Sequence, residues 1–319
     1  MIAEAVIFVI IPTYNAEKTI AGVLSGIPEF VDQVIVIDDC SLDNTSNIVR
    51  NFQHNDPRVT LLRHEQNQGV GGALLSGYRL ALDKNAAIIV KMDSDGQMDP
   101  VYMDQLISPI LSGESDYTKG NRFLHEKELR HMPYIRRIGN LGLSFLTKVA
   151  SGYWNIFDPT NGYTAIGSNA LRSLDFRRLS KRYFFETSML LELGLQRLVV
   201  KDIYIPAIYG DESSKLSNLK ALFEFPPKLF LGMLRRIIFL YFIRDLTAVS
   251  IFSIAGIVSV IFGSLWGIYH WWRSSVTGVE ASTGTVMIAI LPLILGIQFL
   301  LQAVGMDIQN TPQKDGWGR

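Results

Sequence analysis

The stretch AAIIVKMDSDGQMDP, residues 86–100, joins a run of apolar residues to two aspartates, Asp93 and Asp95, that stand one residue apart. A short apolar run bounded by Gly and Pro is typical of a strand that is buried on both faces. Gly96 favours a turn directly after it, because glycine accepts backbone conformations that other residues avoid. The sequence therefore predicts a buried strand that delivers two carboxylates to one point at its carboxyl end.

Short β-branched runs and amphipathic segments alternate through the first 120 residues. The expected strands are 5–11, 33–38, 59–64, 86–92 and 116–121, and the expected helices are 16–27, 42–52, 69–82 and 100–111. This alternation predicts an α/β fold with a mostly parallel sheet covered by helices on both faces. Ligands bind beyond the carboxyl ends of the strands in such folds. Four segments should therefore share one rim: 13–15, 38–45, 67–73 and 93–97.

Asp93, Asp95 and the nearby amide of Gln97 suit Mg²⁺ or Mn²⁺, because both ions prefer hard oxygen ligands and take the remaining ones from water and phosphate. An ion held there would neutralise charge on a diphosphate leaving group. The alternative is a helix N-cap, in which Asp95 or Asp99 accepts hydrogen bonds from the first amides of the next helix. The two aspartates alone do not decide between these interpretations.

The other rim segments favour a nucleotide ligand. An acidic group after the second strand commonly accepts hydrogen bonds from a nucleoside, and the glycines of residues 67–73 let backbone amides approach a ligand. That glycine run lacks the lysine of a P-loop and does not follow the first strand, so neither common phosphate-binding fingerprint applies. The candidate nucleotide-binding residues in these segments are Pro12, Tyr14, Asn15, Asp38, Asp39 and Asn67.

The chain carries 30 basic and 30 acidic side chains, so no global field favours nucleic acid. Its mean hydropathy of +0.19 is raised by two uncharged stretches, residues 248–272 and 286–306, each long enough to cross a bilayer. Buried helices of a soluble core are the alternative, but such helices seldom stay uncharged on every face. The connection 273–285 carries two formal charges, and a basic cluster precedes the first stretch: Lys220, Lys228, Arg235, Arg236 and Arg244. By the positive-inside rule, both termini are predicted to be cytoplasmic.

Three parts are predicted from these patterns. Residues 1–215 form a cytoplasmic catalytic domain, and residues 246–319 form a domain of two membrane-spanning helices with a short cytoplasmic tail. Residues 216–245 mix apolar and basic residues around Pro226 and Pro227, which predicts two amphipathic helices lying on the bilayer surface. Such an architecture is compatible with a symmetric homo-oligomer.

Four segments, IIPTYNAEKTI (10–20), VIVIDDCSLDNT (34–45), NQGVGGAL (67–74) and VKMDSDGQMDP (90–100), resemble the family 2 glycosyltransferases of the GT-A fold. Further segments resemble the polyprenyl-phosphate branch of that family, which includes dolichol-phosphate mannose synthases and undecaprenyl-phosphate glucosyltransferases: KGNRF (119–123), DPTNGYTAI (158–166), YFFETSML (183–190) and SSKLS (213–217). The resemblance implies that the nucleotide-sugar is held by Pro12, Tyr14, Asp39 and Asp93. It also implies that Asp95 and Gln97 coordinate the metal at the diphosphate.

An acceptor with a phosphate at the bilayer surface needs fixed cations, and the candidates are Arg122, Arg136, Arg137 and Lys215. Arginine suits phosphate through its bidentate fork, although each of these residues could instead be a solvated surface charge. The sequence does not distinguish between Arg136 and Arg137, whereas Arg122 and Lys215 match family motifs.

Two further carboxylates have alternative roles. Glu186 lies where many relatives place a catalytic base, but a phosphate acceptor is already ionised, so Glu186 could instead position groups or bind the donor sugar. Asp158 is either a turn former or an active-site carboxylate that orients an arginine or a sugar hydroxyl. The residues predicted to carry catalysis are Asp93, Asp95, Arg122, Asp158 and Glu186.

The predicted activity is inverting transfer of a hexose, with glucose as the expected sugar, from a UDP-sugar to polyprenyl phosphate at the cytoplasmic face of the cell membrane. Two alternatives remain at this point. One is a processive polysaccharide synthase, which is disfavoured because the sequence has no Q-x-x-R-W motif. The other is a catalytically silent membrane scaffold that binds a nucleotide-sugar.

Overall fold

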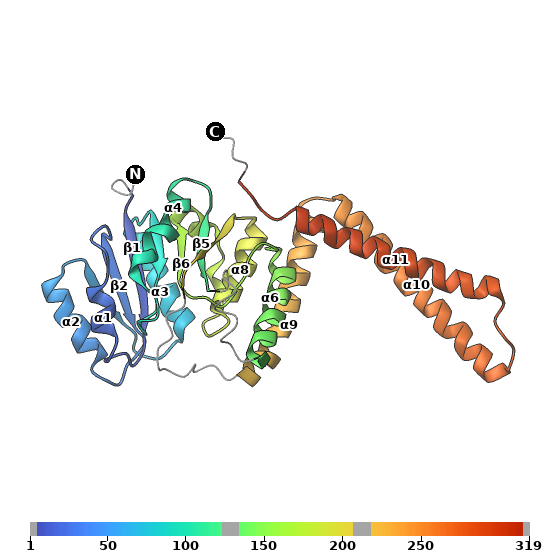
Figure 1. Ribbon diagram of the computed structural model, residues 1–319, viewed down its shortest axis with the longest axis horizontal. Helices are drawn as coiled ribbons and strands as arrows, with labels where there is room; N and C mark the ends of the chain where they lie inside the picture. Colours follow the sequence, from blue (N-terminus) through green and yellow to red (C-terminus); the bar gives the residue numbers. More distant parts are fainter. Residues whose placement is uncertain (1–4, 123–133, 207–217, 315–319) are drawn as a thin grey trace. The chain divides into compact units, whose positions relative to one another are not determined.

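The computed structural model describes residues 5–122, 134–206 and 218–314. The chain divides into two compact units, Met1–Met233 together with Pro312–Arg319, and Leu234–Thr311. The first unit contains the sheet and its helices, and the second contains two long apolar helices (Figure 1).

The described strands of the first unit form one seven-stranded sheet in the order β3-β2-β1-β4-β6-β5-β7. Only β6 runs antiparallel to its neighbours, β4 and β5, and the other pairings are parallel. The mostly parallel sheet predicted from the sequence is therefore confirmed. The strands are β1 (Ile7–Thr13), β2 (Gln33–Asp38), β3 (Val59–Arg63), β4 (Ile88–Lys91), β5 (Tyr117–Asn121), β6 (Thr164–Gly167) and β7 (Val200–Tyr204).

Helices cover both faces of the sheet, because the central strands are apolar on both sides (Figure 1). Along β1, Phe8 and Ile10 pack in a core with α3 and α8, whereas Ile7, Val9 and Ile11 pack in a second core with α1, α2 and α4. The helices of this unit are α1 (Ile20–Ser25), α2 (Thr45–Asn55), α3 (Val70–Asp83), α4 (Met103–Leu111), α6 (Tyr134–Ser151), α7 (Ser168–Ser173) and α8 (Phe185–Gln196), with 3₁₀ turns η2 (Pro100–Tyr102) and η3 (Phe176–Arg178).

Residues 216–245 differ from the prediction of two helices around Pro226 and Pro227. A single helix, α9 (Asn218–Ile238), contains both prolines and continues into a π-helical segment, η4 (Phe239–Arg244). Proline removes an amide donor inside a helix, so the sequence favours a break there. Packing outweighs this effect, because Phe225 and Leu229 are buried in a small core with Ala150 and Phe184.

The second unit consists mainly of α10 (Ala248–Thr277) and α11 (Thr283–Gln309), which contain the two predicted spans. Their most apolar windows are 22% and 6% buried, whereas a core helix of a soluble protein would be mostly buried. Glycines let the two helices approach closely: a Cβ on Gly296 would lie 2.8 Å from the backbone nitrogen of Val260. These two helices are candidate membrane spans.

A buried ion pair lies at one end of this helix pair. The two guanidinium nitrogens Nη1 and Nη2 of Arg236 lie 2.7 and 2.9 Å from the two carboxylate oxygens of Asp307, and the Tyr241 hydroxyl donates to Asp307 Oδ1 at 2.6 Å. Burial and the hydrogen bond to Asp307 raise the pKa of Tyr241 to about 12. The end of α9, the π-helical segment and α11 are thus joined within the second unit.

Candidate active site

The loop after β1 is joined to the loop after β2 by hydrogen bonds. Asn15 has a left-handed backbone (φ 51°), its amide donates to Ser41 Oγ at 2.9 Å, and its side-chain oxygen accepts from the Leu42 amide at 2.9 Å. Pro12 is buried within β1, and the Tyr14 side chain is exposed on the rim. Asn15 therefore shapes the loop in which Tyr14 is presented.

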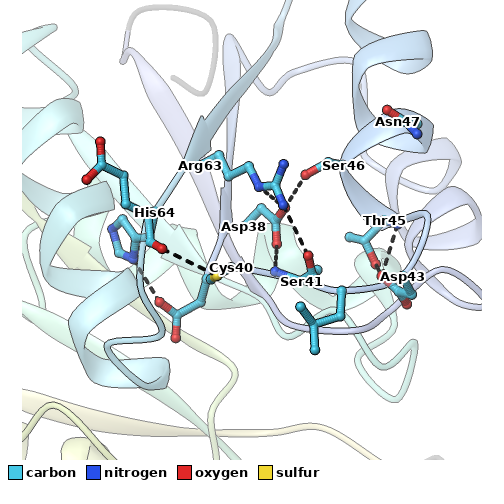
Figure 2. Close-up of polar contacts among 12 residues, drawn as sticks. Asp38, Cys40, Ser41, Asp43, Thr45, Ser46, Asn47, Arg63 and His64 are labelled. Atoms are coloured by element: carbon cyan, nitrogen blue, oxygen red, sulfur yellow. Dashed lines mark hydrogen bonds and ion pairs between the residues drawn. The ribbon is translucent and has the colours of Figure 1, made fainter.

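Asp38, at the end of β2, is fully buried and bonded to the protein (Figure 2). Its Oδ1 accepts from the Ser41 amide at 2.9 Å, and its Oδ2 accepts from the Ser46 hydroxyl and lies 3.5 Å from Arg63 Nε. Because Asp38 is buried and both of its carboxylate oxygens already have partners, its role is to organise the loop after β2. The donor contact predicted for Asp38 stays a prediction.

Asp39 connects the loop after β2 to the glycine-rich start of α3. Its two oxygens accept from the amides of Gln68 at 2.9 Å and Gly69 at 2.8 Å, and Oδ1 lies 2.8 Å from His64 Nδ1. Asn67 donates its side-chain amide to the Asp39 carbonyl at 3.2 Å. Two of the predicted donor-binding residues, Asp39 and Asn67, are thus brought together, and His64 is a neighbour that sequence reasoning did not find.

The turn after β4 carries the predicted metal ligands. Asp95 Oδ1 accepts from the Gln97 amide at 2.9 Å, whereas the carboxylate that caps the following η2 turn is Asp99, which accepts from the Val101 amide at 3.0 Å. Asp95 is therefore not the cap of the following helical segment, although capping was one of its two interpretations. Both aspartates and Gln97 are half-buried on the rim.

These oxygen donors fit a divalent cation that also binds phosphate. Among the described residues no group of three or more His, Cys, Asp or Glu side chains could hold a metal by itself. Mg²⁺ and Mn²⁺ sites in phosphate-transferring enzymes commonly use only one or two carboxylates and complete their ligand set with phosphate and water. The Asp93–Gln97 turn matches that kind of site better than an all-protein metal site.

Lys91, the last residue of β4, lies beneath this turn and joins it to α8. Its ammonium lies 2.9 Å from Asp93 Oδ1 and 2.9 Å from Glu186 Oε1, and its side chain is 2% exposed. Burial alone would lower the pKa of Lys91, but Asp93 and Glu186 outweigh it and raise that pKa above its ordinary value. Sequence reasoning missed Lys91, although a lysine inside an apolar strand was a signal of a buried partner.

Arg122, directly after β5, is held by Asp158. The Nε and Nη2 atoms of Arg122 donate to the two oxygens of Asp158 at 2.7 and 2.9 Å, and Asp158 has a left-handed backbone (φ 50°) and a side chain 2% exposed. Burial would raise the pKa of Asp158, but the charge and hydrogen bonds of Arg122 outweigh it and lower that pKa. Of the roles weighed for Asp158, the structure supports the carboxylate that orients an arginine.

A second buried pair supports this turn from β7. Lys119 Nζ lies 3.3 Å from Asp202 Oδ1 and donates to the Phe157 carbonyl at 2.6 Å. Asp202 Oδ2 accepts from the Asn121 side chain at 2.9 Å and from the Phe157 amide at 2.7 Å. The backbone just before Asp158 is therefore fixed by side chains from two neighbouring strands, which sequence reasoning also missed.

Residues 158–162 connect Arg122 to the turn that carries the predicted metal ligands. Asp158 bonds Arg122 at the start of this segment, and at its end a Cβ on Gly162 would lie 2.6 Å from Asp93 Oδ2 and would collide with Lys91 Nζ. Five residues thus bring Arg122 and Asp158 into one site with Asp93 and Glu186. The side chains of Arg136 and Arg137, and all of Lys215, lie outside the described residues.

Comparison with known proteins assigns the chain to a family. The model of "Glycosyl transferase family 2" matches residues 8–175, just over half of the chain. The chain belongs to this family. It is therefore a glycosyltransferase, and the resemblance seen in the rim segments is confirmed.

Two curated relatives are similar over most of their own lengths. The UDP-N-acetylglucosamine–dolichyl-phosphate N-acetylglucosaminyltransferase of Methanococcus voltae is 34% identical over 66% of this chain and 89% of its own. The undecaprenyl-phosphate mannosyltransferase of Micrococcus luteus is 29% identical over 66% of this chain and 88% of its own.

Among solved structures, glucosyl-3-phosphoglycerate synthase from Mycobacterium tuberculosis, bound to Mn²⁺, UDP-glucose and phosphoglyceric acid, matches with a TM-score of 0.54 and 21% identity. It covers 73% of this chain and 80% of that chain. This likeness concerns the fold, and it agrees with the GT-A fold expected from the sequence.

Proposed function

We propose that this glycosyltransferase transfers one sugar from a nucleoside-diphosphate sugar to the phosphate of a polyprenyl phosphate at the membrane. The observation that carries the proposal is the segment 158–162, which bonds Arg122 at one end and lies against Asp93 at the other. A cation for an acceptor phosphate and a carboxylate turn for a donor diphosphate thus belong to one site. The two relatives named above, which act on dolichyl phosphate and undecaprenyl phosphate, support this acceptor class.

The reaction needs no protein base to create the nucleophile. A phosphate monoester is ionised near neutral pH, so its oxygen attacks the anomeric carbon as the bond from that carbon to the diphosphate breaks. The electron pair of the broken bond leaves with the diphosphate oxygen. One displacement inverts the anomeric centre, so an α-linked donor gives a β-linked lipid phosphosugar. Glu186, which accepts from the Lys91 ammonium at 2.9 Å, fits such a reaction better as a positioning group than as a base.

Asp95 and Gln97 would hold a Mg²⁺ or Mn²⁺ ion beside Asp93, and the ion when bound would neutralise charge on the departing nucleoside diphosphate. On the acceptor side, Asp158 holds the Arg122 guanidinium through two nitrogens, and the side chain of Arg122 remains 38% exposed. A phosphate can therefore approach the exposed part of an arginine that is already oriented.

The two long apolar helices are the basis of the membrane arrangement that we propose. We propose that α10 and α11 form a hairpin that enters and leaves the bilayer on the cytoplasmic side, where the first unit lies. In support, Pro312–Arg319 belong to the same unit as Met1–Met233, and Lys314 Nζ lies 2.7 Å from Asp116 Oδ1 in that unit. Protease protection of a C-terminal tag in sealed inverted vesicles tests this topology, and a protected tag would contradict it.

The donor is proposed to be a UDP-sugar. Glucose is the sugar that we expect from the sequence. Because the two relatives transfer N-acetylglucosamine and mannose, the test includes these two sugars as well. The full chain, purified in detergent, is incubated with undecaprenyl phosphate, Mg²⁺ or Mn²⁺, and radiolabelled UDP-glucose, UDP-N-acetylglucosamine or GDP-mannose. We expect label in the organic phase from one donor, and we expect a chelator to abolish it. Donor binding without label from any of the three would instead favour a silent scaffold.

A further inference from the structure

Lys91 is a buried cation shared by carboxylates from two different elements. Asp93 comes from the turn after β4 and Glu186 from the first turn of α8, 93 residues later in the chain. A buried ammonium is costly unless it is paired and hydrogen-bonded, so the two carboxylates stabilise Lys91 where it is. In return, Lys91 lets two negative charges lie side by side and fixes their geometry.

Each carboxylate uses one oxygen on Lys91 and retains a second one. In residues 5–122, 134–206 and 218–314, no hydrogen bond is made to Asp93 Oδ2 or Glu186 Oε2. Their side chains are 32% and 15% exposed, so both residues are accessible from the rim. The site therefore presents two acceptor oxygens with spare hydrogen-bonding capacity, one on each of the two carboxylates that share Lys91.

Gly162 covers the ammonium and leaves no room for a side chain. A Cβ at this position would collide with Lys91 Nζ and lie 2.6 Å from Asp93 Oδ2. The backbone of residues 158–162 therefore limits where the ammonium can be. A methyl group added at Gly162 would press on both partners of the Lys91–Asp93 contact without removing a charge, which offers a second way to disturb that contact.

We propose that Lys91 is a positioning residue, which holds Asp93 and Glu186 so that their free oxygens accept hydrogen bonds from hydroxyl groups of the donor's sugar. This inference rests on the proposed function. A sugar carries several hydroxyl donors, and two carboxylates fixed by one cation can accept hydrogen bonds from more than one of them. UDP without its sugar lacks these hydroxyls, so Lys91 should affect the sugar's share of donor binding far more than the nucleotide's.

The test compares binding of UDP and of a UDP-sugar to the full chain in detergent with Mg²⁺, by isothermal titration calorimetry. The probe is the UDP-sugar that the transfer panel identifies. In Lys91→Met, the Kd of the UDP-sugar should rise by about tenfold or more, the scale of losing a hydrogen bond to a charged group. The Kd of UDP should change by less than about threefold, because UDP lacks the sugar and a substitution away from a ligand usually has only a small effect.

Gly162→Ala should give the same pattern, because its methyl group would collide with the ammonium and crowd Asp93 Oδ2 while every charge remains. The control is Glu192→Gln on the same helix, where a buried carboxylate lies 3.3 Å from Arg178 instead of Lys91. This control should leave both Kd values unchanged. Equal weakening of UDP and UDP-sugar in Lys91→Met, or no weakening in either Lys91→Met or Gly162→Ala, would overturn the inference.

A melting experiment separates this inference from the proposed function. Lys91→Met should lower the melting midpoint, and adding Glu186→Gln should restore part of the loss, because it removes one carboxylate that has lost its cation. Strictly additive losses would reject the shared-cation arrangement. If the wild type binds none of the UDP-sugars, the proposed function fails; if it binds one and Lys91→Met binds it equally well, only the role of Lys91 fails.

Discussion

We propose that one half of the site binds the donor and the other the acceptor, and the two halves, named after these ligands, are built in different ways. In the donor half, defined as residues 12–15, 38–45, 63–73 and 91–97, carboxylates are held largely by backbone amides, as in the bonds of Asp39 to Gly69 and of Asp95 to Gln97. In the acceptor half, defined as residues 119–122 and 157–162, the main bonds join charged side chains, as in Arg122 with Asp158.

This difference determines what each half tolerates. Every residue except proline supplies an amide, so a carboxylate in the donor half depends on the path of the backbone more than on a partner's identity. A buried ion pair in the acceptor half depends on both side chains, and removing one leaves the other charged and unpaired. The donor half should therefore be sensitive at the turn proposed to bind the metal, and the acceptor half at each member of its ion pairs.

The largest effect is expected in the donor half, from Asp95→Asn. This change removes one charge from the proposed metal site, and we expect turnover to fall by about 10²–10³-fold, as for loss of one charge-stabilising group in other active sites. Radiolabel transfer measures it, and an unchanged melting midpoint excludes a folding defect. Asp99→Asn is the matched control, because asparagine also caps helical turns and should preserve turnover. Wild-type turnover in Asp95→Asn would remove the metal assignment.

An intermediate effect is expected in the acceptor half, from Arg122→Lys. Lysine keeps the charge but cannot make the two parallel hydrogen bonds to Asp158, so the cation is no longer oriented. We expect the KM for polyprenyl phosphate to rise by about tenfold, while the Kd of the donor stays the same. A change in donor Kd as large as the change in acceptor KM would mean that the two halves do not act separately.

The smallest effect concerns stability in acid. Arg122 lowers the pKa of Asp158 below 3.8 in the folded chain, so the ionised pair contributes stability that is present above pH 3.8 and is lost as the pH falls through the lower folded value. Above pH 3.8 the melting midpoint of the wild type should exceed that of Arg122→Met by roughly 2–4 °C. This difference should shrink as the pH falls below 3.8. Melting curves of both proteins between pH 3 and 6 measure it, and a difference that stays constant would contradict the coupling.

Lys91 lies in the donor half but also bonds Glu186 of α8, and it marks the limit of what the sequence predicts. The rim motifs predicted Asp93, Asp95 and Gln97 because their spacing after a buried strand is local. Glu186 and Asp158 were found with their roles undecided, because each role depends on a cation that is distant in sequence: Lys91 for one and Arg122 for the other. Lys119 and Asp202 were missed, because neither local sequence indicates that the two residues form an ion pair in the folded chain.

By itself, the sequence determined the alternation of strands and helices, the two long apolar segments and the rim on which the polar residues gather. These features follow from the pattern of apolar and polar residues over short stretches, and that pattern can be read from each stretch alone. Only the tertiary structure decided that β6 runs antiparallel between β4 and β5, that α9 continues through two prolines, and that Lys91 joins Asp93 to Glu186. Strand pairing, packing and ion pairing depend on which distant segments meet, and no single stretch of the chain contains that information.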